Sequence, residues 1–360
     1  MAKRSALHSV ATAAGSDFLE LHGWALPEAY TDLASEYKSA TTATAVYDAS
    51  YMGRLKATGD DALDLLNRLS TNKVVDLEPG QGAPTILTTD RGRILDMIIA
   101  VHAGDHILLL TSPGTQDSVI QWLGKYTIME DLTVEDVSSS TAMLAVWGPN
   151  SRESVEKAAG VALGALPRCH SLVAAMGNRQ VRVVACSMSD LPGYYLICPT
   201  SAAQAVWQRM VDAGAKPIGA SAYETARISN GVPAHGQEVG EEYNPLEAGL
   251  TGAIDFTKGC YIGQEVIARL DSYHKVQKYL VKLDFTQGAI VAPGAVLTQS
   301  GKPVGKVTSV ASNPATGRVI ALAYVRTQQA VVGVRLELES PGTGAAEVQS
   351  LPQMFGPAQG

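Results

Sequence analysis

The sequence predicts an α+β protein with two consecutive split β-α-β units and a C-terminal β-barrel. Between residues 51 and 137, apolar β-branched runs and amphipathic stretches follow one another in the order β-α-β-β-β-α-β, and a similar succession returns between 142 and 219. From about residue 275, helical periodicity disappears and short strands are separated by Gly, Pro and Asn. This order favours antiparallel sheets with helices on one face over a doubly wound dinucleotide fold.

The first unit begins with a strand and a capped helix. Residues 51–58 have the pattern of a strand, and Asp60 is a typical N-cap for a helix on which Leu63, Leu66 and Asn67 share a face. Three further strands, a helix opened by the turn sequence Pro-Gly and a closing strand are expected at 85–89, 93–101, 106–111, 113–123 and 132–137.

The second unit repeats this order. Its strand, helix, two strands, second helix and final strand are expected at 142–147, 151–159, 180–186, 194–198, 201–213 and 216–219. The strands of the barrel are expected at 279–285, 304–310, 319–325 and 334–338, and the Gly/Pro/Gln-rich end, 352–360, is expected to fray. The predicted domains are 1–140, 141–274 and 275–360.

The composition excludes several classes of protein. The 360 residues are 46% hydrophobic and 18% charged, which is the balance of a globular chain and not of a disordered one. A net charge of −7 argues against a general nucleic-acid scaffold. No apolar run approaches the roughly 18 residues of a membrane helix. We therefore expect a cytoplasmic protein, while the basic, acid-free start of the chain leaves organelle targeting as an alternative.

Several common kinds of site are not encoded. The chain has no GxxxxGK[ST] sequence for phosphates, no HExxH or GxSxG, and no histidine pair with ligand spacing, so no metal is expected. The cysteines Cys169, Cys186, Cys198 and Cys260 lie 17, 12 and 62 residues apart. This spacing fits neither a paired-cysteine metal site nor a dense disulfide framework, so reduced thiols are expected.

The most informative segment is KGCYIGQEVIAR, which starts at Lys258. Gly259 and Gly263 bracket a thiol and an aromatic ring just before a helix expected over 263–270. Unpaired N–H groups and the helix dipole favour an anion there, and Lys258 adds positive charge, so the Cys260 thiol is expected to ionise readily. The glycines allow positive φ or close approach of a ligand. A buried cysteine in a Gly-rich turn is the structural alternative.

This segment, preceded by NPLEAGL at 244–250, resembles the signature of YgfZ-type folate-binding proteins. These are relatives of the glycine-cleavage T-protein (aminomethyltransferase) that support iron–sulfur cluster assembly or repair and have been linked to tRNA modification. The N-terminal region is also similar to the T-protein, whose GWxMPxxY and FDVSHMG match residues 23–30 and YDASYMG at 47–53. The resemblance implies a ring of two α+β domains and a barrel around tetrahydrofolate. The signature residues are Gly259, Tyr261, Gly263, Gln264 and Glu265.

The T-protein segment GGxxDD matches Gly92 to Met97, GRILDM. Met97 therefore stands where the resemblance places the catalytic second aspartate. A thioether can neither act as a base nor stabilise a developing ammonium, which argues against aminomethyl transfer by that mechanism. Asp96 remains and is a substitute candidate, but in a strand it should point to the face opposite its neighbour.

A second difference concerns the pterin. The T-protein segment GEDGFE matches residues 190–195, so Tyr195 replaces the glutamate that holds the pterin ring. A phenol can stack on the ring or form one hydrogen bond, but it cannot accept a bidentate pair. Arg227 in ARISNG matches a T-protein arginine that faces the folate. Met52 matches the turn that lines the folate site, and Ile99 falls in the strand that lines it. For each of the three, packing in the core or on the surface is the alternative. Further flat faces are offered by Trp24 and Trp147.

We therefore expect a YgfZ-like protein that binds tetrahydrofolate or a derivative and supports iron–sulfur cluster assembly without classical turnover. Its functional groups are Cys260 and Lys258, and its cavity is lined by Met52, Asp96, Ile99, Tyr195 and Arg227. Expected partners are iron–sulfur assembly proteins or client enzymes. A transient iron–sulfur cluster is the second cofactor considered, although the cysteine spacing does not support it. One alternative is a folate-dependent aminomethyltransferase or demethylase. Another is a tRNA-modification accessory, suggested by the basic residues Arg269, His274, Lys275, Lys278 and Lys282.

Overall fold

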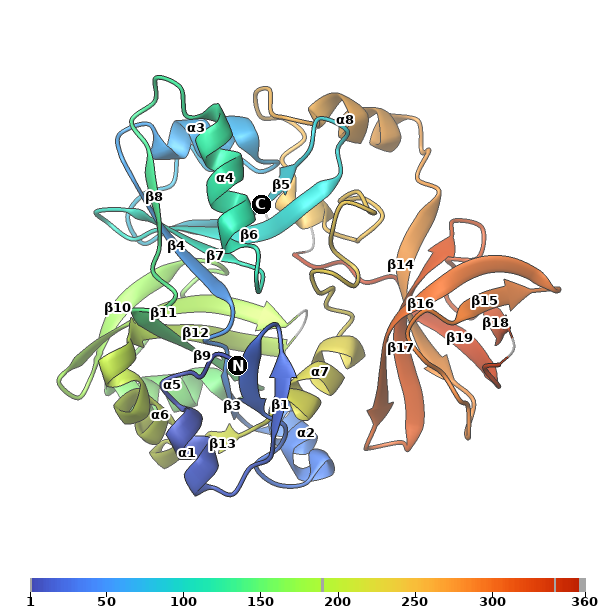
Figure 1. The fold of residues 1–360 in the computed structure, drawn as a ribbon, viewed down its shortest axis with the longest axis horizontal. Coiled ribbons are helices and arrows are strands. Elements are labelled where there is room, and N and C mark those ends of the chain that lie inside the picture. Colours follow the sequence, from blue (N-terminus) through green and yellow to red (C-terminus); the bar gives the residue numbers. More distant parts are fainter. Residues whose placement is uncertain (1, 189–190, 340, 356–360) are drawn as a thin grey trace. The chain divides into compact units, whose positions relative to one another are not determined.

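The computed structural model describes residues 2–188, 191–339 and 341–355 (Figure 1). The chain divides into two compact units, and neither is continuous in sequence. Unit 1 consists of residues 1–67, 73–85 and 98–223. Unit 2 consists of residues 68–72, 86–97 and 224–360. No helix in the described ranges is long and apolar enough to cross a membrane.

The first of the two large sheets has five strands, in the order β5-β6-β7-β4-β8. Its elements follow in the chain as β4 (Gly53–Thr58), α3 (Ala62–Leu69), β5 (Gly82–Thr88), β6 (Ile94–His102), β7 (Ile107–Thr111), α4 (Gln116–Tyr126) and β8 (Thr133–Asp136). The predicted order β-α-β-β-β-α-β is thus confirmed. Helix α4 forms because Val119 and Leu123 recur at helical spacing and are both buried.

The second sheet repeats this plan with one strand added. Its elements are β9 (Thr141–Trp147), α5 (Ser151–Ala159), β10 (Ser171–Met176), β11 (Arg179–Met188), β12 (Leu191–Pro199), α6 (Ala203–Asp212) and β13 (Lys216–Pro217). The strand order is β10-β11-β12-β9-β3-β13, in which β3 (Ala45–Asp48) lies between β9 and β13. If β3 is left out, the other five strands, taken in chain order, have the same arrangement as the five strands of the first sheet. Strand β10 was not predicted, because its sequence SLVAAM is poor in β-branched and aromatic residues.

The two faces of the second sheet differ in character. Residues of even number on β3 and β9, such as Val46 and Val146, pack in one core with Val155 of α5 and Trp207 of α6. Side chains alternate along a strand, so the odd-numbered residues of β3 and β9 emerge on the opposite face. This second face carries the aromatic residues described below.

The N-terminal segment forms two short helices and a hairpin that the sequence did not predict. They are α1 (His8–Ala13), β1 (Phe18–Leu21), β2 (Trp24–Pro27) and α2 (Leu33–Thr42). The two-residue turn of the hairpin has positive φ at both His22 (51°) and Gly23 (75°), which suits the right-handed twist of the flanking strands. Helix α2 begins where the Asp32 side chain accepts a hydrogen bond from Ser35 N.

Unit 2 contains the predicted C-terminal barrel. Helix α7 (Ala220–Ser229) begins in unit 1 and continues into unit 2, and helix α8 (Gln264–Ser272) precedes the barrel. Six strands close the barrel in the order β14-β17-β16-β15-β18-β19. Their bounds are β14 (Lys278–Phe285), β15 (Val296–Gln299), β16 (Lys302–Asn313), β17 (Arg318–Arg326), β18 (Arg335–Leu338) and β19 (Ala345–Ser350). Phe285 and Leu297 are among the buried residues that fill it.

The expected fraying of residues 352–360 is wrong for its described part. Met354 N donates a hydrogen bond to Gly249 O over 3.0 Å, and Phe355 is buried. A Cβ atom at Gly249 would lie 2.0 Å from Pro352 O, so the two backbones are in close contact. Residues 356–360 lie outside the described residues.

Candidate functional site

An aromatic cluster covers the second face of the larger sheet in unit 1. Tyr223 stacks on Tyr47 with 4.5 Å between ring centroids and on Trp147 with 5.0 Å, and Tyr195 meets Trp147 edge-on at 6.5 Å. The strand register places Tyr47 and Tyr195 in one row, on either side of Ala145. Burial raises the pKa of Tyr195 well above its ordinary value, so this phenol stays neutral and can donate a hydrogen bond.

Gly193 makes room for this cluster. It lies directly opposite Trp147 in the β9–β12 pair. A Cβ atom at position 193 would lie 1.9 Å from Cδ1 of Trp147, so the indole ring crosses β12 where a side chain is missing. The position of Trp147 against Tyr195 therefore depends on this glycine.

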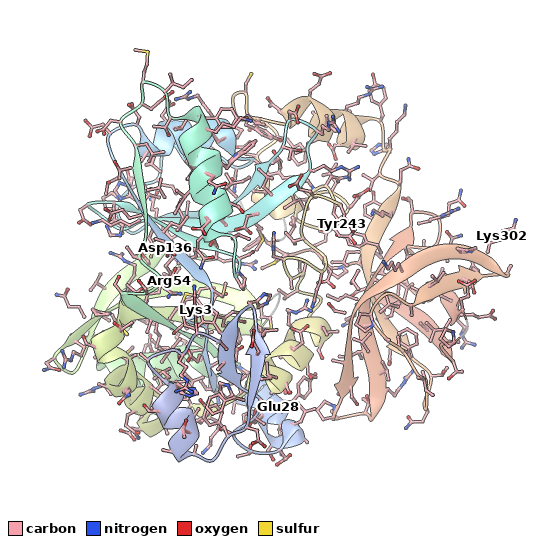
Figure 2. The ribbon with its side chains drawn as sticks, in the orientation of Figure 1. Lys3, Glu28, Arg54, Asp136, Tyr243 and Lys302 are labelled. Atoms are coloured by element: carbon pink, nitrogen blue, oxygen red, sulfur yellow. The ribbon has the colours of Figure 1, made fainter. Side chains whose placement is uncertain are left out.

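Met52 lies in the turn between β3 and β4, and a buried arginine holds this turn. Arg54 is 0% exposed, and its guanidinium donates to the carbonyl oxygens of Ser50, Met52 and Ser138 and to the hydroxyl of Thr141. Burial lowers the pKa of Arg54 to about 10, so the group remains charged at neutral pH. Figure 2 labels Arg54 together with Asp136, whose charge opposes this shift.

Sequence reasoning missed Arg54. The sequence places Arg54 within a run that has the pattern of a buried strand, which could have indicated a buried arginine. An arginine in such a run is also compatible with a strand at the edge of a sheet. Only the register, which pairs β4 with both β7 and β8, shows that Arg54 lies on a central strand.

Asp96 and Ile99 both lie on β6, where Ile99 pairs with Leu110 of β7. Side chains alternate along the strand, so Asp96 and Ile99 leave opposite faces, while Met97 shares the face of Ile99. Asp96 is buried and Met97 is partly exposed, as expected for neighbours on opposite faces. Asp96 thus lies on the face opposite Met97, and its role as a substitute carboxylate stays a prediction.

Arg227, on α7 in unit 2, is the centre of a buried ion network. Its guanidinium forms ion pairs with Glu224 and, over 3.1 Å, with the fully buried Glu238. It also donates to Gln237 and, over 2.8 Å, to the hydroxyl of Ser309 on β16. This arginine therefore joins α7, the segment after it and the barrel, and the expectation that it faces a folate stays a prediction.

The Lys258 side chain anchors its own segment, and the expectation that its charge acts on the thiol stays a prediction. Its Nζ donates to Ser70 O over 2.9 Å and to Asn72 O over 2.7 Å, and it lies 5.3 Å from the centroid of the Tyr261 ring. Burial lowers the pKa of Lys258 to about 8, against the opposing effect of Asp255. Lys258 therefore ties the signature segment to residues 68–72.

This lowered pKa can be measured directly. In a heteronuclear NMR titration of the side-chain amines, we expect the Lys258 resonance to titrate near pH 8, because burial disfavours the ammonium form. The unfolded chain binds the proton more tightly, so this group disfavours folding below pH 8 and this cost declines as the pH rises toward 10.5. Lys258→Met identifies the resonance. A midpoint at the ordinary 10.5 would contradict the assigned environment.

Cys260 differs from the other three cysteines. All four are free, but Cys169, Cys186 and Cys198 are buried, whereas Cys260 is exposed. Burial raises the pKa of Cys169 to about 12 and that of Cys198 to about 11, which leaves these thiols unreactive. The structural alternative of a buried cysteine therefore does not apply to Cys260.

The segment around Cys260 is fixed at both ends. Before it, Asp255 Oδ1 accepts hydrogen bonds from the backbone N–H groups of Thr257 and Lys258. After it, Ile262 O accepts from the Thr88 hydroxyl and Ile262 N donates to Arg68 O. The loop thus presents its thiol from a defined backbone.

Helix α8 begins one residue later than expected. Its N-cap is Gly263, with φ of 84°, and Cys260 precedes the first helical residue, Gln264, by four positions. Cys260 is therefore not the capping residue, and the expected ease of ionisation of its thiol stays a prediction. Glu265 is exposed in the first turn, where a carboxylate complements the helix dipole. No group of three or more potential metal ligands occurs among the described residues.

Comparison with known proteins agrees with this fold. Residues 7–258 match the profile of the GCVT N-terminal domain, and residues 278–355 match that of the glycine cleavage T-protein C-terminal barrel domain. The chain belongs to the glycine cleavage T-protein family. The crystal structure of glycine cleavage system aminomethyltransferase T from Bartonella henselae covers 99% of both chains with a TM-score of 0.87 and 23% identity. That likeness shows a T-protein fold.

Curated relatives in the T-protein family carry two kinds of name. A protein called aminomethyltransferase from Picosynechococcus is 27% identical over 343 residues, which are 94% of this chain and 94% of that protein. The protein of the same name from Bacillus subtilis is 27% identical over 346 residues, which are 94% of this chain and 95% of that protein. A chloroplastic protein of Arabidopsis thaliana, named as a transferase, is 33% identical over 289 residues. That match covers 80% of this chain but only 66% of the Arabidopsis protein.

Proposed function

We propose that this T-protein relative binds a reduced folate and supports iron–sulfur cluster assembly or repair through Cys260. The observation that carries this proposal is an exposed thiol on a segment held by a buried lysine and by hydrogen bonds on both sides. The chain keeps its other three thiols buried. In addition, Met97 occupies the position of the aspartate that the T-protein resemblance assigns to catalysis, so the usual transfer chemistry lacks its carboxylate.

Membership of the T-protein family and the aromatic face in unit 1 support the folate part of the proposal. Tyr195 is partly exposed beside Trp147, so it offers a flat face and a neutral phenol to a pterin ring. A tyrosine cannot replace both hydrogen bonds of a carboxylate, and we therefore expect stacking to provide more of the affinity here than in the aminomethyltransferases.

In this proposal, Cys260 acts as a nucleophile or as a transient ligand for iron, and the folate acts as a one-carbon or redox-active group. A thiolate is suited to both roles, since it is a strong nucleophile and a soft ligand. Lys258 holds the backbone from which the thiol emerges and is thus a positioning residue. The partners expected here are iron–sulfur assembly proteins or client enzymes.

The proposal is tested in cells that lack the endogenous protein, by measuring the activity of iron–sulfur enzymes. We expect the parent chain and Gly259→Ala to restore these activities, because Gly259 has no atom within 4 Å of an added Cβ and the thiol is unchanged. We expect Cys260→Ser not to restore them. Equal rescue by Cys260→Ser would show that the thiol is not the functional group.

A second candidate function is folate-dependent aminomethyl transfer. The bacterial relatives named aminomethyltransferase match this chain over nearly their whole length, which favours this alternative. Purified protein is assayed for methylene-tetrahydrofolate formed from an aminomethyl or N-methyl donor. We expect no turnover by the parent chain; clear turnover would make the transferase the better assignment.

The tRNA-accessory alternative has less support. Three of the five basic residues that suggested it have structural contacts. Lys275 lies over the ring of Tyr273, Lys278 lies over the rings of Tyr243 and Tyr324, and Lys282 Nζ donates to Ser229 O. A salt-dependent RNA-binding measurement would decide it, because phosphate contacts weaken steeply as salt rises.

A further inference from the structure

A groove of about 710 Å³ lies in unit 2 against the outside of the barrel. One wall is the segment after α7, which includes Gln237 and Tyr243, and the other comes from strands β14, β16 and β17. Figure 2 labels Tyr243 at this wall and Lys302 at the far end of β16. The volume is typical of sites for small molecules.

Three cations from adjacent strands line this groove. Lys278 on β14 lies directly opposite Arg326 on β17, and Lys306 on β16 lies opposite Tyr324. Paired residues share a face, and Tyr324 and Arg326 are two positions apart, so all three cations emerge on the same face. Like charges directly opposite each other are destabilising, which makes the Lys278–Arg326 pair unfavourable in the empty groove.

The protein itself does not neutralise these cations at close range. Within the described part of the chain, no carboxylate oxygen lies within 4 Å of the side-chain nitrogens of Lys278, Lys306 or Arg326. Two glutamates also line the groove, but Glu224 is paired with Arg227 and Glu242 contacts Tyr243. The carboxylate of Glu247 acts on Lys278 only from a longer distance.

A rigid aromatic base holds Lys278 in place. The rings of Tyr243 and Tyr324 stack with 3.9 Å between centroids, and Lys278 Nζ lies 4.3 and 5.1 Å from these centroids. The Tyr324 hydroxyl donates to Glu238 O over 2.7 Å, which fixes the stack. Burial raises the pKa of Tyr243 to about 12, so the ring presents no negative charge to a ligand at neutral pH.

We propose that this groove binds a small organic or inorganic anion with two or more acidic groups. Lys278 and Arg326 bind one group jointly, which removes their mutual repulsion, and Lys306 binds a second. Charge-assisted hydrogen bonds of this kind are among the strongest in proteins, and a bidentate arginine adds geometric selectivity. The site does not depend on the proposed folate function, and its residues belong to unit 2.

The test is calorimetric titration of the full chain at low salt with citrate, pyrophosphate and acetate. We expect citrate or pyrophosphate to bind at least about tenfold more tightly than acetate, since acetate can engage only one part of the site. Binding of citrate would identify polycarboxylates as the ligand class. Binding of pyrophosphate would identify phosphate esters as the ligand class. If neither bound more tightly than acetate, the proposal would be wrong.

Matched variants locate the site. We expect Arg326→Gln and Lys306→Gln to weaken binding by about tenfold, the loss of one charge-assisted contact. The control is Lys302→Gln. Lys302 lies on β16, as Lys306 does, but it is exposed and does not line the groove, so the loss of its charge should leave binding unchanged. Equal weakening by Lys302→Gln would show only a general effect of net charge and would overturn the proposal.

The melting temperature provides a second measurement, which distinguishes a role of Arg326 in ligand binding from a purely structural role. Without ligand, we expect Arg326→Gln to melt at a higher temperature than the parent chain, because the repulsion from Lys278 is removed. With saturating citrate or pyrophosphate, the order should reverse, because only the parent chain gains the full binding energy. A variant that melts lower both with and without ligand would contradict the proposed role of the cation pair.

Discussion

Arg54→Met is expected to lower the free energy of unfolding by about 3–5 kcal/mol. The guanidinium is completely buried, and its hydrogen bonds reach the turn at Ser50 and Met52 on one side and the Ser138 and Thr141 segment on the other. Methionine fills much of the volume but leaves several buried carbonyl oxygens without a donor, each costing about 1–3 kcal/mol. Urea denaturation followed by circular dichroism measures the loss.

The matched control is Lys56→Met on the same strand. Lys56 is partly exposed, so this change should cost less than about 1 kcal/mol. Arg54→Lys keeps the charge but not the forked donor geometry, and it should remain well below the parent chain in stability. Hydrogen exchange should also show faster opening of residues 49–53 in Arg54→Met. A loss no larger than that of Lys56→Met would contradict the role of Arg54 as the support of this turn.

Gly263→Ala is expected to destabilise the signature segment by about 2–4 kcal/mol. Gly263 has φ of 84°, a region that side-chained residues rarely adopt. In addition, a Cβ atom there would lie 2.5 Å from Thr89 O and 2.9 Å from the Thr88 hydroxyl oxygen. Because Thr88 also binds Ile262 O, the change disturbs the contact that fixes the loop after Cys260. Hydrogen exchange of residues 258–266 measures the local opening.

Gly259→Ala is the matched control for this prediction. Gly259 has no atom within 4 Å of an added Cβ, so alanine there should leave both the global stability and the local exchange rates nearly unchanged. If both alanine variants behaved alike, the close packing of Gly263 against Thr88 and Thr89 would not describe the protein in solution.

Local patterns predicted most of the regular elements. The repeat β-α-β-β-β-α-β was readable because each helix carries apolar residues at helical spacing, and each strand is a short β-branched run. The signature segment was also readable, including the two glycines and the thiol before a helix. The position of β3 between β9 and β13 was not, because strand order depends on contacts between distant parts of the chain.

The same limit applies to the candidate site. The sequence predicted the strand that carries Ala145 and Trp147 but no strand at Tyr47, and one aromatic face results only when β3, β9 and β12 pair in register. Arg227 is a candidate ligand of folate through the resemblance, and that expectation stays a prediction. Its partners Glu238 and Ser309 are 11 and 82 residues away, so the sequence did not indicate the ion network around it. Lys258 likewise finds its acceptors at Ser70 and Asn72, which no spacing rule indicates.

The most direct test of the central claim is calorimetric titration of tetrahydrofolate into the parent chain, Tyr195→Phe and Tyr195→Leu. We predict saturable binding by the parent chain, nearly equal binding by the phenylalanine variant, which keeps the flat ring beside Trp147, and about two- to tenfold weaker binding by the leucine variant. The absence of saturable binding by the parent chain, or binding that Tyr195→Leu leaves unchanged, would contradict a reduced-folate site on this aromatic face.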